Sequence, residues 1–237
     1  ALIKSVQANG VAATIKHFIA NEQDADRHTV SSKVDERTLR ELYLRPFEAA
    51  VKEAGVWCVM NAYNRLNGPH CSEHPWLLTD LLKKEWGFRG LVMSDWGSVY
   101  STAGPIKAGM DIEMPNGKFL NRDAIMPLLK DGTVTEAQLD EMVRRILRVA
   151  VSMGFFDREQ KDEKIPLEDP ASAAVALKMA REALVLLKND NGALPLDPAK
   201  RQRIVLIGPN ADPAVTGGGG SSYTETFSTV SALQAIK

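Results

Sequence analysis

Cysteine is scarce in this sequence, and so are long apolar runs and any excess of positive charge. Two cysteines, Cys58 in an apolar run and Cys71 in a polar loop, cannot form a disulfide framework, so cysteine usage leaves the compartment open. No stretch approaches the roughly 18 uninterrupted apolar residues of a membrane-spanning helix. A formal net charge of -1 gives no basic surface for nucleic acid. We therefore expect neither a membrane nor a nucleic-acid partner.

An initiator methionine and a secretory signal are also missing at the start of the chain. The opening residues, ALIKSVQANG, do not follow the order of charged, apolar and small residues that such a signal has. We therefore expect the chain to begin within a domain. What the sequence does have is 44% hydrophobic and 25% charged residues, a composition typical of globular proteins with a sizeable core.

Short apolar runs predict β-strands that are buried on both faces. None of these runs alternates cleanly, and each is followed by polar residues and then by a longer helical segment, as in parallel sheets covered by helices. We expect strands at residues 11–15 (VAATI), 56–60 (VWCVM), 91–93 (LVM) and 109–114 (GMDIEM).

The segments between these runs carry apolar residues at helical spacing. Pro46 should kink or split the first helix, and Gly87 should end the second. Thr135 and Gln138 form a capping box ahead of a third helix, which Gly154 closes. These helices are expected at residues 34–54, 76–86 and 135–153.

Alternating strands and helices predict βαβ units and a parallel sheet, so the fold class is α/β. An open doubly wound sheet and a (β/α)8 barrel both fit this pattern. A barrel usually needs about 250 residues, whereas the first predicted domain ends at residue 156. If the domain is a barrel, residues 1–156 are its C-terminal part and its opening strands are not in this chain.

A charged segment with two prolines, DREQKDEKIPLEDP, follows the first domain and predicts an interdomain linker at residues 157–170. A helix at residues 170–189 and a strand at residues 203–208 (RIVLIG) then predict the beginning of a second, incomplete α/β domain at residues 171–237. The glycine-rich stretch GGGGSS predicts a flexible loop whose backbone can approach a ligand closely.

Polar residues at the exits of the predicted strands point to a binding site. In parallel α/β folds the carboxyl ends of the strands open on one side, and ligands bind there. Pairs from three exits should therefore converge on one rim, although they are far apart in the sequence. They are Lys16 and His17, Asn61 and Tyr63, and Asp95 and Trp96.

The chemistry of this set favours a carbohydrate ligand. Asp95 can act as a nucleophile or stabilise a developing cation, and the charge of Lys16 would hold it ionised. Lys16, His17 and Asn61 are donors suited to sugar hydroxyls, whereas Tyr63 and Trp96 offer flat faces to a pyranose ring. The rival of an open-sheet nucleotide-binding enzyme has no phosphate-binding loop in this sequence.

Five motifs together resemble glycoside hydrolase family 3, of the β-glucosidase or β-xylosidase type. They are KHFIANEQ (16–23), VMNAYNRLNG (59–68), GFRGLVMSDWGSV (87–99), AGMDIEMP (108–115) and LLKNDNGALPL (186–196). They occur in the order that the family has and extend over nearly the whole chain. The resemblance implies a (β/α)8-type barrel followed by an α/β sandwich domain, with the active site between them.

The resemblance also implies retaining hydrolysis of terminal β-D-glucosyl or similar residues from a β-linked oligosaccharide or glycoside, with no metal and no cofactor. Asp95 matches the catalytic nucleophile, whose partner carboxyl group lies about 5 to 5.5 Å away in retaining enzymes. The positions that match the innermost sugar subsite are Lys16, His17, Met60, Tyr63 and Trp96.

In glucosidase-type members the acid/base Glu lies further along the second domain than this chain extends, so other parts of the same enzyme should complete the site. The family's β-N-acetylglucosaminidases use a His within a KHFPGHG-like pattern, which residues 19–22 (IANE) replace here. That substitution argues against this activity. A β-xylosidase, a β-N-acetylglucosaminidase and a catalytically inactive carbohydrate-binding fragment stay open as alternatives.

The remaining polar clusters have structural interpretations. Asp111 and Glu113 should belong to a structural network, and Glu22 should hold the loop after Lys16 and His17. Glu225 is not expected to be the missing acid. In PHCSEH, His70, Cys71 and His74 lack a second ligand pair for zinc, so a surface loop is the better interpretation.

Overall fold

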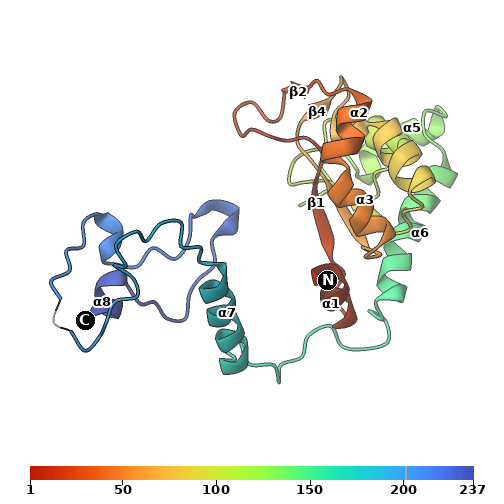
Figure 1. Cartoon of the computed structure of the whole chain (residues 1–237). Helices are drawn as coiled ribbons and strands as arrows, with labels where there is room; N and C mark the ends of the chain where they lie inside the picture. The colour runs from red at the N-terminus through yellow and green to blue at the C-terminus, as the bar shows by residue number, and fades with distance from the viewer. Residues whose placement is uncertain (201) are drawn as a thin grey trace. The chain divides into compact units, whose positions relative to one another are not determined.

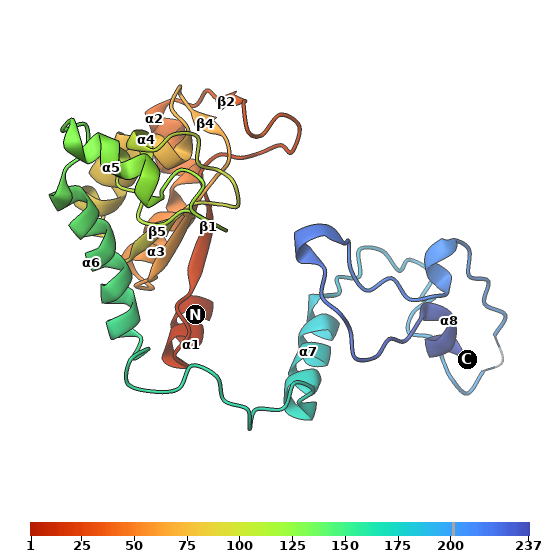
Figure 2. The same ribbon diagram turned by 180° about the vertical axis from the view of Figure 1, so that it is seen from behind.

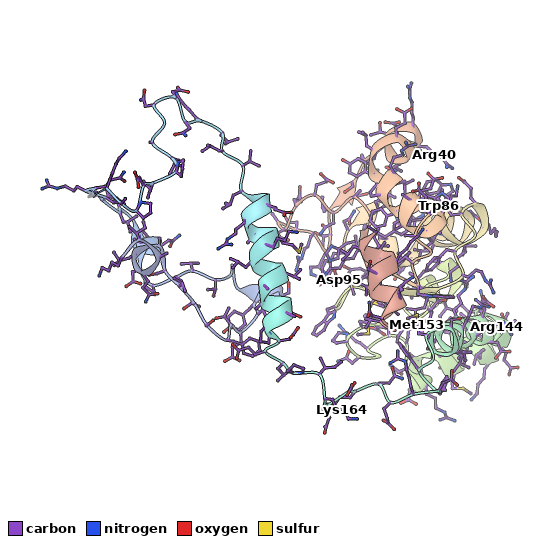
Figure 3. The ribbon with its side chains drawn as sticks, turned by 60° about the horizontal axis from the view of Figure 1, so that its bottom comes forward. Arg40, Trp86, Asp95, Arg144, Met153 and Lys164 are labelled. Carbon is purple, nitrogen blue, oxygen red and sulfur yellow. The ribbon has the colours of Figure 1, made fainter. Side chains whose placement is uncertain are left out.

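The computed structural model describes residues 1–200 and 202–237, which form two compact units (Figure 1). Unit 1 comprises Ala1–Gln160 and unit 2 comprises Lys161–Lys237. The division falls inside the segment 157–170, for which the sequence predicts a linker. Lys164, labelled in Figure 3, lies in the extended stretch that precedes α7.

Unit 1 is built on a parallel three-stranded sheet of β1 (Thr14–Phe18), β3 (Cys58–Asn61) and β5 (Leu91–Met93). The strands are ordered β1-β3-β5, with Thr14 opposite Cys58 and Cys58 opposite Leu91. A parallel bridge from Met93 to Ile112 continues this order. Strands that follow one another without a reversal are what a (β/α)8-type sheet requires, whereas a doubly wound sheet reverses at a switch point.

The predicted strand at residues 11–15 is displaced along the chain. β1 begins at Thr14, so Lys16 and His17 lie within the strand and not after it. The reason is the partner strand: the N–H of Cys58 donates to the carbonyl of Ala13, and the pairing continues to Phe18 beside Asn61. The predicted strand at 109–114 is reduced to the single bridge at Ile112.

The predicted helices of unit 1 are present. The first is split ahead of Pro46, as expected, and Gly87, with φ +69°, follows the second. Both members of the Thr135–Gln138 capping box are formed. Their bounds are α2 Glu36–Thr38, the π-helical η1 Leu39–Tyr43, α3 Arg45–Lys52, the π-helical η3 Trp76–Glu85, and α6 Glu136–Ser152.

The other elements of unit 1 are short. They are α1 Leu2–Ala8, η2 Cys71–Glu73, α4 Ala103–Ala108, α5 Arg122–Lys130, and the parallel pair β2 Ser31–Ser32 and β4 Arg65–Leu66. Figures 1 and 2 show α1 at the amino end of β1 and the β2–β4 pair at the opposite end of the unit. The carboxyl ends of the parallel strands therefore open toward β2 and β4.

The core of unit 1 lies between the sheet and its helices. Phe18, at the end of β1, is fully buried, with its ring 5.0 Å from that of Phe47 and 6.1 Å from that of Trp86. On the side of β5, Val149 of α6 and Met153, which directly follows that helix, are buried against the sheet. Side chains from α3 and α6, and from the residues that directly follow η3 and α6, therefore pack against the strands.

Unit 2 contains α7 (Pro170–Ala183), η4 (Pro209–Ala211), η5 (Gly220–Ser222) and α8 (Ala232–Ile236). α7 ends six residues before the predicted limit at residue 189, and residues 203–208 form no strand. Ser231 is the one buried residue among those described in this unit. The apolar run therefore has no neighbouring strand to pair its backbone, and a β-strand exists only with a partner.

Across the described part of the chain, no helix combines the length and apolar character needed to cross a membrane.

Candidate active site

The candidate site lies where β5 leaves the core. Val92 is fully buried in β5, and Asp95 follows two residues after the strand ends at Met93. The chain turns at once, because the N–H of Ser98 donates to the Asp95 carbonyl at 3.1 Å and Gly97 adopts φ +76°. The turn keeps the Asp95 side chain at the carboxyl end of the sheet, where it is 10% exposed. Figure 3 shows Asp95 on a different part of unit 1 from Arg144 on α6.

The carboxylate of Asp95 receives donors from residues at the ends of all three strands. Oδ1 accepts from the backbone N–H of Trp96 at 2.7 Å and from the hydroxyl of Tyr63 at 3.2 Å. Oδ2 lies 3.2 Å from Nε2 of His17. The predicted convergence of His17, Tyr63 and Asp95 is therefore present in the structure.

His17 is the basic side chain that forms an ion-pair contact with Asp95 in the described part of the chain. Burial lowers the pKa of His17 below 6.5, the Asp95 carboxylate acts against that effect, and the charges of Lys16 and Arg27 add to it. The imidazole is consequently uncharged at neutral pH. Because an ionised carboxylate only accepts hydrogen bonds, Nε2 carries the proton that faces Oδ2. The ring is 38% exposed, so it can also contact a ligand.

Tyr63 is held between Asp95 and two residues that the sequence analysis did not identify. The guanidinium of Arg27 lies 4.3 Å from the centre of the Tyr63 ring, and the His28 ring meets it edge-on at 4.5 Å. Burial and the charge of Asp95 raise the pKa of Tyr63, so its hydroxyl stays protonated and donates. Arg27 and His28 lie in the irregular loop between β1 and β2, where only their position after a strand exit could have indicated a role.

The other predicted site residues have fewer contacts with Asp95. The Trp96 residue is 63% exposed and touches Asp95 through its backbone. Met60 is half-buried in β3, opposite Met93. Lys16 is exposed, and no ion pair within 4 Å joins it to Asp95 among the described residues. The basic side chain beside Oδ2 is that of His17.

Asn61 does not face the site as a sugar-binding donor. Its side chain is fully buried, and its amide nitrogen donates to the carbonyl of Ala62 at 2.8 Å and to Oγ of Ser98 at 3.1 Å. Both N–H groups are therefore used inside the protein. Asn61 instead ties β3 to the turn that follows Asp95.

Asp111 and Glu113 form the structural network that the sequence predicts. Asp111 pairs with Lys83 of η3 at 3.0 Å and accepts from the backbone N–H of Val92 at 2.7 Å. Burial raises the pKa of Asp111 and lowers that of Lys83, and each charge partly offsets the effect on the other. Glu113 accepts two backbone N–H groups of the loop at 119–120, at 2.9 and 2.7 Å.

The residues of PHCSEH have contacts within the protein. His70 stacks on Tyr100 at 3.6 Å, and His74 accepts from the N–H of Leu77 at 3.3 Å. Burial raises the pKa of the Cys71 thiol to about 12. Within the residues described, no three His, Cys, Asp or Glu side chains are grouped so as to hold a metal ion. Glu22 and Glu225 are both exposed.

Two family models match the chain. The model of the glycosyl hydrolase family 3 N-terminal domain matches residues 1–149, and that of the C-terminal domain matches residues 184–237. Among curated relatives, a β-glucosidase of Rhizobium radiobacter is 48% identical over 238 residues, which are 100% of this chain and 29% of the relative. β-Glucosidase B of Emericella nidulans is 41% identical, covering 95% of this chain and 27% of its own length.

Solved structures are similar over almost the whole chain. β-Glucosidase 3B of Thermotoga neapolitana in complex with glycerol has a TM-score of 0.90 and 43% identity, covering 99% of this chain and 33% of its own. The β-glucosidase of Kluyveromyces marxianus in complex with glucose has a TM-score of 0.91 and 38% identity, covering 99% of this chain and 29% of its own. The chain thus spans about a third or less of the relatives' length.

Proposed function

Because the chain belongs to glycoside hydrolase family 3, we propose that it supplies the nucleophile side of the active site of a retaining β-glucosidase. The observation that carries this proposal is the Asp95 carboxylate, oriented by donors from three strand ends. The similar proteins support the substrate class, because those cited above are named β-glucosidases and one was solved with glucose.

In the first step, an oxygen of Asp95 attacks the anomeric carbon of a terminal β-glucosyl residue. A covalent glycosyl ester forms, the bond to the leaving oxygen breaks with its electron pair, and a general acid protonates that oxygen. In the second step, water attacks the anomeric carbon and the ester bond breaks. The water proton passes to the residue that served as the acid, and Asp95 regains its charge.

The surrounding side chains fit the binding of one sugar ring. His17 can donate a hydrogen bond to a sugar hydroxyl. Two further donors are the exposed ammonium of Lys16, next to His17 in β1, and the guanidinium of Arg27, which lies over the Tyr63 ring. Tyr63 and Trp96 supply aromatic faces, with Met60 as an apolar neighbour in β3. None of these roles requires a metal or a cofactor.

The general acid is proposed to be a Glu outside this chain. The carboxylates of the structural network, Asp111 and Glu113, are both buried and hydrogen-bonded within unit 1. Neither is free to protonate a leaving oxygen. The polypeptide of the relatives' length would therefore be needed for turnover.

The proposal is tested by replacing Asp95→Ala in the polypeptide of the relatives' length. We expect the kcat for a chromogenic β-glucoside to fall by about 10⁴-fold or more, because no covalent intermediate can form. Added azide should restore part of the turnover and give an α-glucosyl azide, since it attacks from the face that Asp95 leaves vacant. Asp123→Ala, on the exposed side of α5, should keep normal activity. An Asp95→Ala enzyme with undiminished turnover would reject the proposal.

A further inference from the structure

Tyr100 lies beneath the loop that carries Tyr63 and has no role in the function proposed above. Its hydroxyl donates to the backbone carbonyl of Tyr63 at 3.0 Å. The same oxygen lies 3.1 Å from Nδ1 of His28, which can donate to it. The Tyr100 ring stacks on His70 at 3.6 Å with an interplanar angle of 20°. The side chain is thus fixed both at its face and at its tip.

These contacts connect to the Asp95 carboxylate. The hydroxyl of Tyr63 is one of two donors on Oδ1, the other being the backbone N–H of Trp96. Tyr100 holds the backbone of the same tyrosine, and His28 touches the edge of its ring. The path from Tyr100 to the carboxylate therefore runs through a single residue, Tyr63.

We propose that Tyr100 is a positioning residue for Asp95, acting through Tyr63, an inference that rests on Asp95 being the nucleophile. Two donors on Oδ1 fix the plane of the carboxylate and leave Oδ2, beside the exposed His17 ring, as the oxygen that attacks. A displacement of about 1 Å in a catalytic group can cost 10²-fold in rate. Holding the Tyr63 backbone is a direct way to prevent such a displacement.

The Tyr100 hydroxyl stays protonated and can be removed alone by substitution. The side chain is half-buried; its burial, and to a smaller extent the nearby Tyr63, raises the pKa of Tyr100 to about 12, so the hydroxyl remains a donor. Tyr100→Phe removes that donor and keeps the ring on His70. The carbonyl of Tyr63 then retains only the longer contact with His70 Nδ1, at 3.4 Å.

A double-mutant cycle in the polypeptide of the relatives' length tests the proposal. We expect Tyr63→Phe and Tyr100→Phe each to lower kcat about tenfold with little change in KM, because a hydrogen bond that orients the nucleophile is lost. The double variant should be no slower than Tyr63→Phe, since Tyr100 acts only through that hydroxyl. Tyr43→Phe, a half-buried tyrosine in η1, is the control and should keep wild-type kcat. Multiplicative losses, or a normal kcat in Tyr100→Phe, would overturn the proposal.

A second measurement does not depend on turnover. Burial and the Asp95 charge raise the pKa of Tyr63. If Tyr100 holds Tyr63 against Asp95, the pKa of Tyr63 should fall toward its ordinary value in Tyr100→Phe, as it should in Asp95→Asn. Carbon-13 NMR of labelled tyrosine rings follows this titration, with Tyr63→Phe assigning the signal. An unchanged Tyr63 titration in Tyr100→Phe would overturn the proposal. An inactive wild type would instead reject the glucosidase function and leave the Tyr63 titration to decide the role of Tyr100.

Discussion

His17 has two opposing influences on its charge, and their balance can be measured. Burial is the larger and lowers its pKa, whereas the Asp95 carboxylate 3.2 Å away raises it. We expect Asp95→Asn to lower the pKa of His17 further, because the imidazolium loses the negative charge that stabilises it. Histidine ring signals in an NMR titration report the midpoint directly. His74, whose pKa is lowered by burial and raised by backbone hydrogen bonds, serves as the control and should keep its midpoint. A higher midpoint for His17 in Asp95→Asn would contradict the contact.

At the scale of single residues, the sequence predicted which side chains gather at the ends of the buried strands. Asp95 and Tyr63 could be predicted because strand ends in parallel sheets share one side. Arg27 and His28 could not, because their loop has no periodicity and reaches Tyr63 only in three dimensions. Asn61 was misassigned because nothing in the sequence indicates that its amide points inward to Ser98.

Between elements, the Lys83–Asp111 pair joins η3 to the segment after α4. The two side chains are 10% and 1% exposed, so Lys83→Met would leave a buried carboxylate without its charge partner. We expect the free energy of unfolding to fall by about 3–5 kcal/mol at neutral pH. Lys84→Met is the matched control: Lys84 is exposed and pairs with Asp80 one turn away, which predicts a change of about 0.5 kcal/mol or less.

The loss in Lys83→Met should depend on pH in a defined direction. Burial already raises the pKa of Asp111, and removing Lys83 takes away the strongest effect that lowers it. The folded state then binds a proton more readily than the unfolded state, so the destabilisation should shrink as the pH falls toward the ordinary value of 3.8. Urea unfolding at several pH values measures this. A penalty that grows on acidification would show that Asp111 is not the unpaired group.

Elements with local signals were predictable, whereas those defined by a partner were not. The Thr135–Gln138 capping box and the break ahead of Pro46 follow from the chemistry of neighbouring residues, and both are present. The start of β1 depends on where β3 begins, which is 44 residues away in the chain, from Thr14 to Cys58. Residues 203–208 have strand-like composition, yet they form no strand because the described part of unit 2 offers them no neighbour.

For the whole molecule, the sequence left an open sheet and a barrel as alternatives. The uninterrupted order β1-β3-β5, together with the similarity to solved β-glucosidases, resolves this in favour of the barrel type. The chain covers 29–33% of the two β-glucosidases of known structure described above. Sequence periodicity could not supply this fact, since it describes only the residues at hand.

Coverage of about a third leads to a prediction about the isolated chain. The 237 residues alone should show no turnover of a chromogenic β-glucoside, because the proposed general acid is outside them. The polypeptide of the relatives' length, assayed in parallel, is the positive control. Measurable turnover by the isolated chain would mean that the acid lies within it, and the carboxylates of unit 1 and Glu225 would have to be reconsidered.

The central claim is that Asp95 forms the covalent bond to the sugar, and trapping that bond tests it most directly. Incubating the polypeptide of the relatives' length with a 2-deoxy-2-fluoro-β-glucosyl fluoride slows hydrolysis of the glycosyl ester, so the intermediate accumulates and mass spectrometry of the peptides locates it. The account predicts a single label on Asp95, in the peptide that contains LVMSDWGSV. A label on any other residue, with Asp95 unmodified, would contradict it.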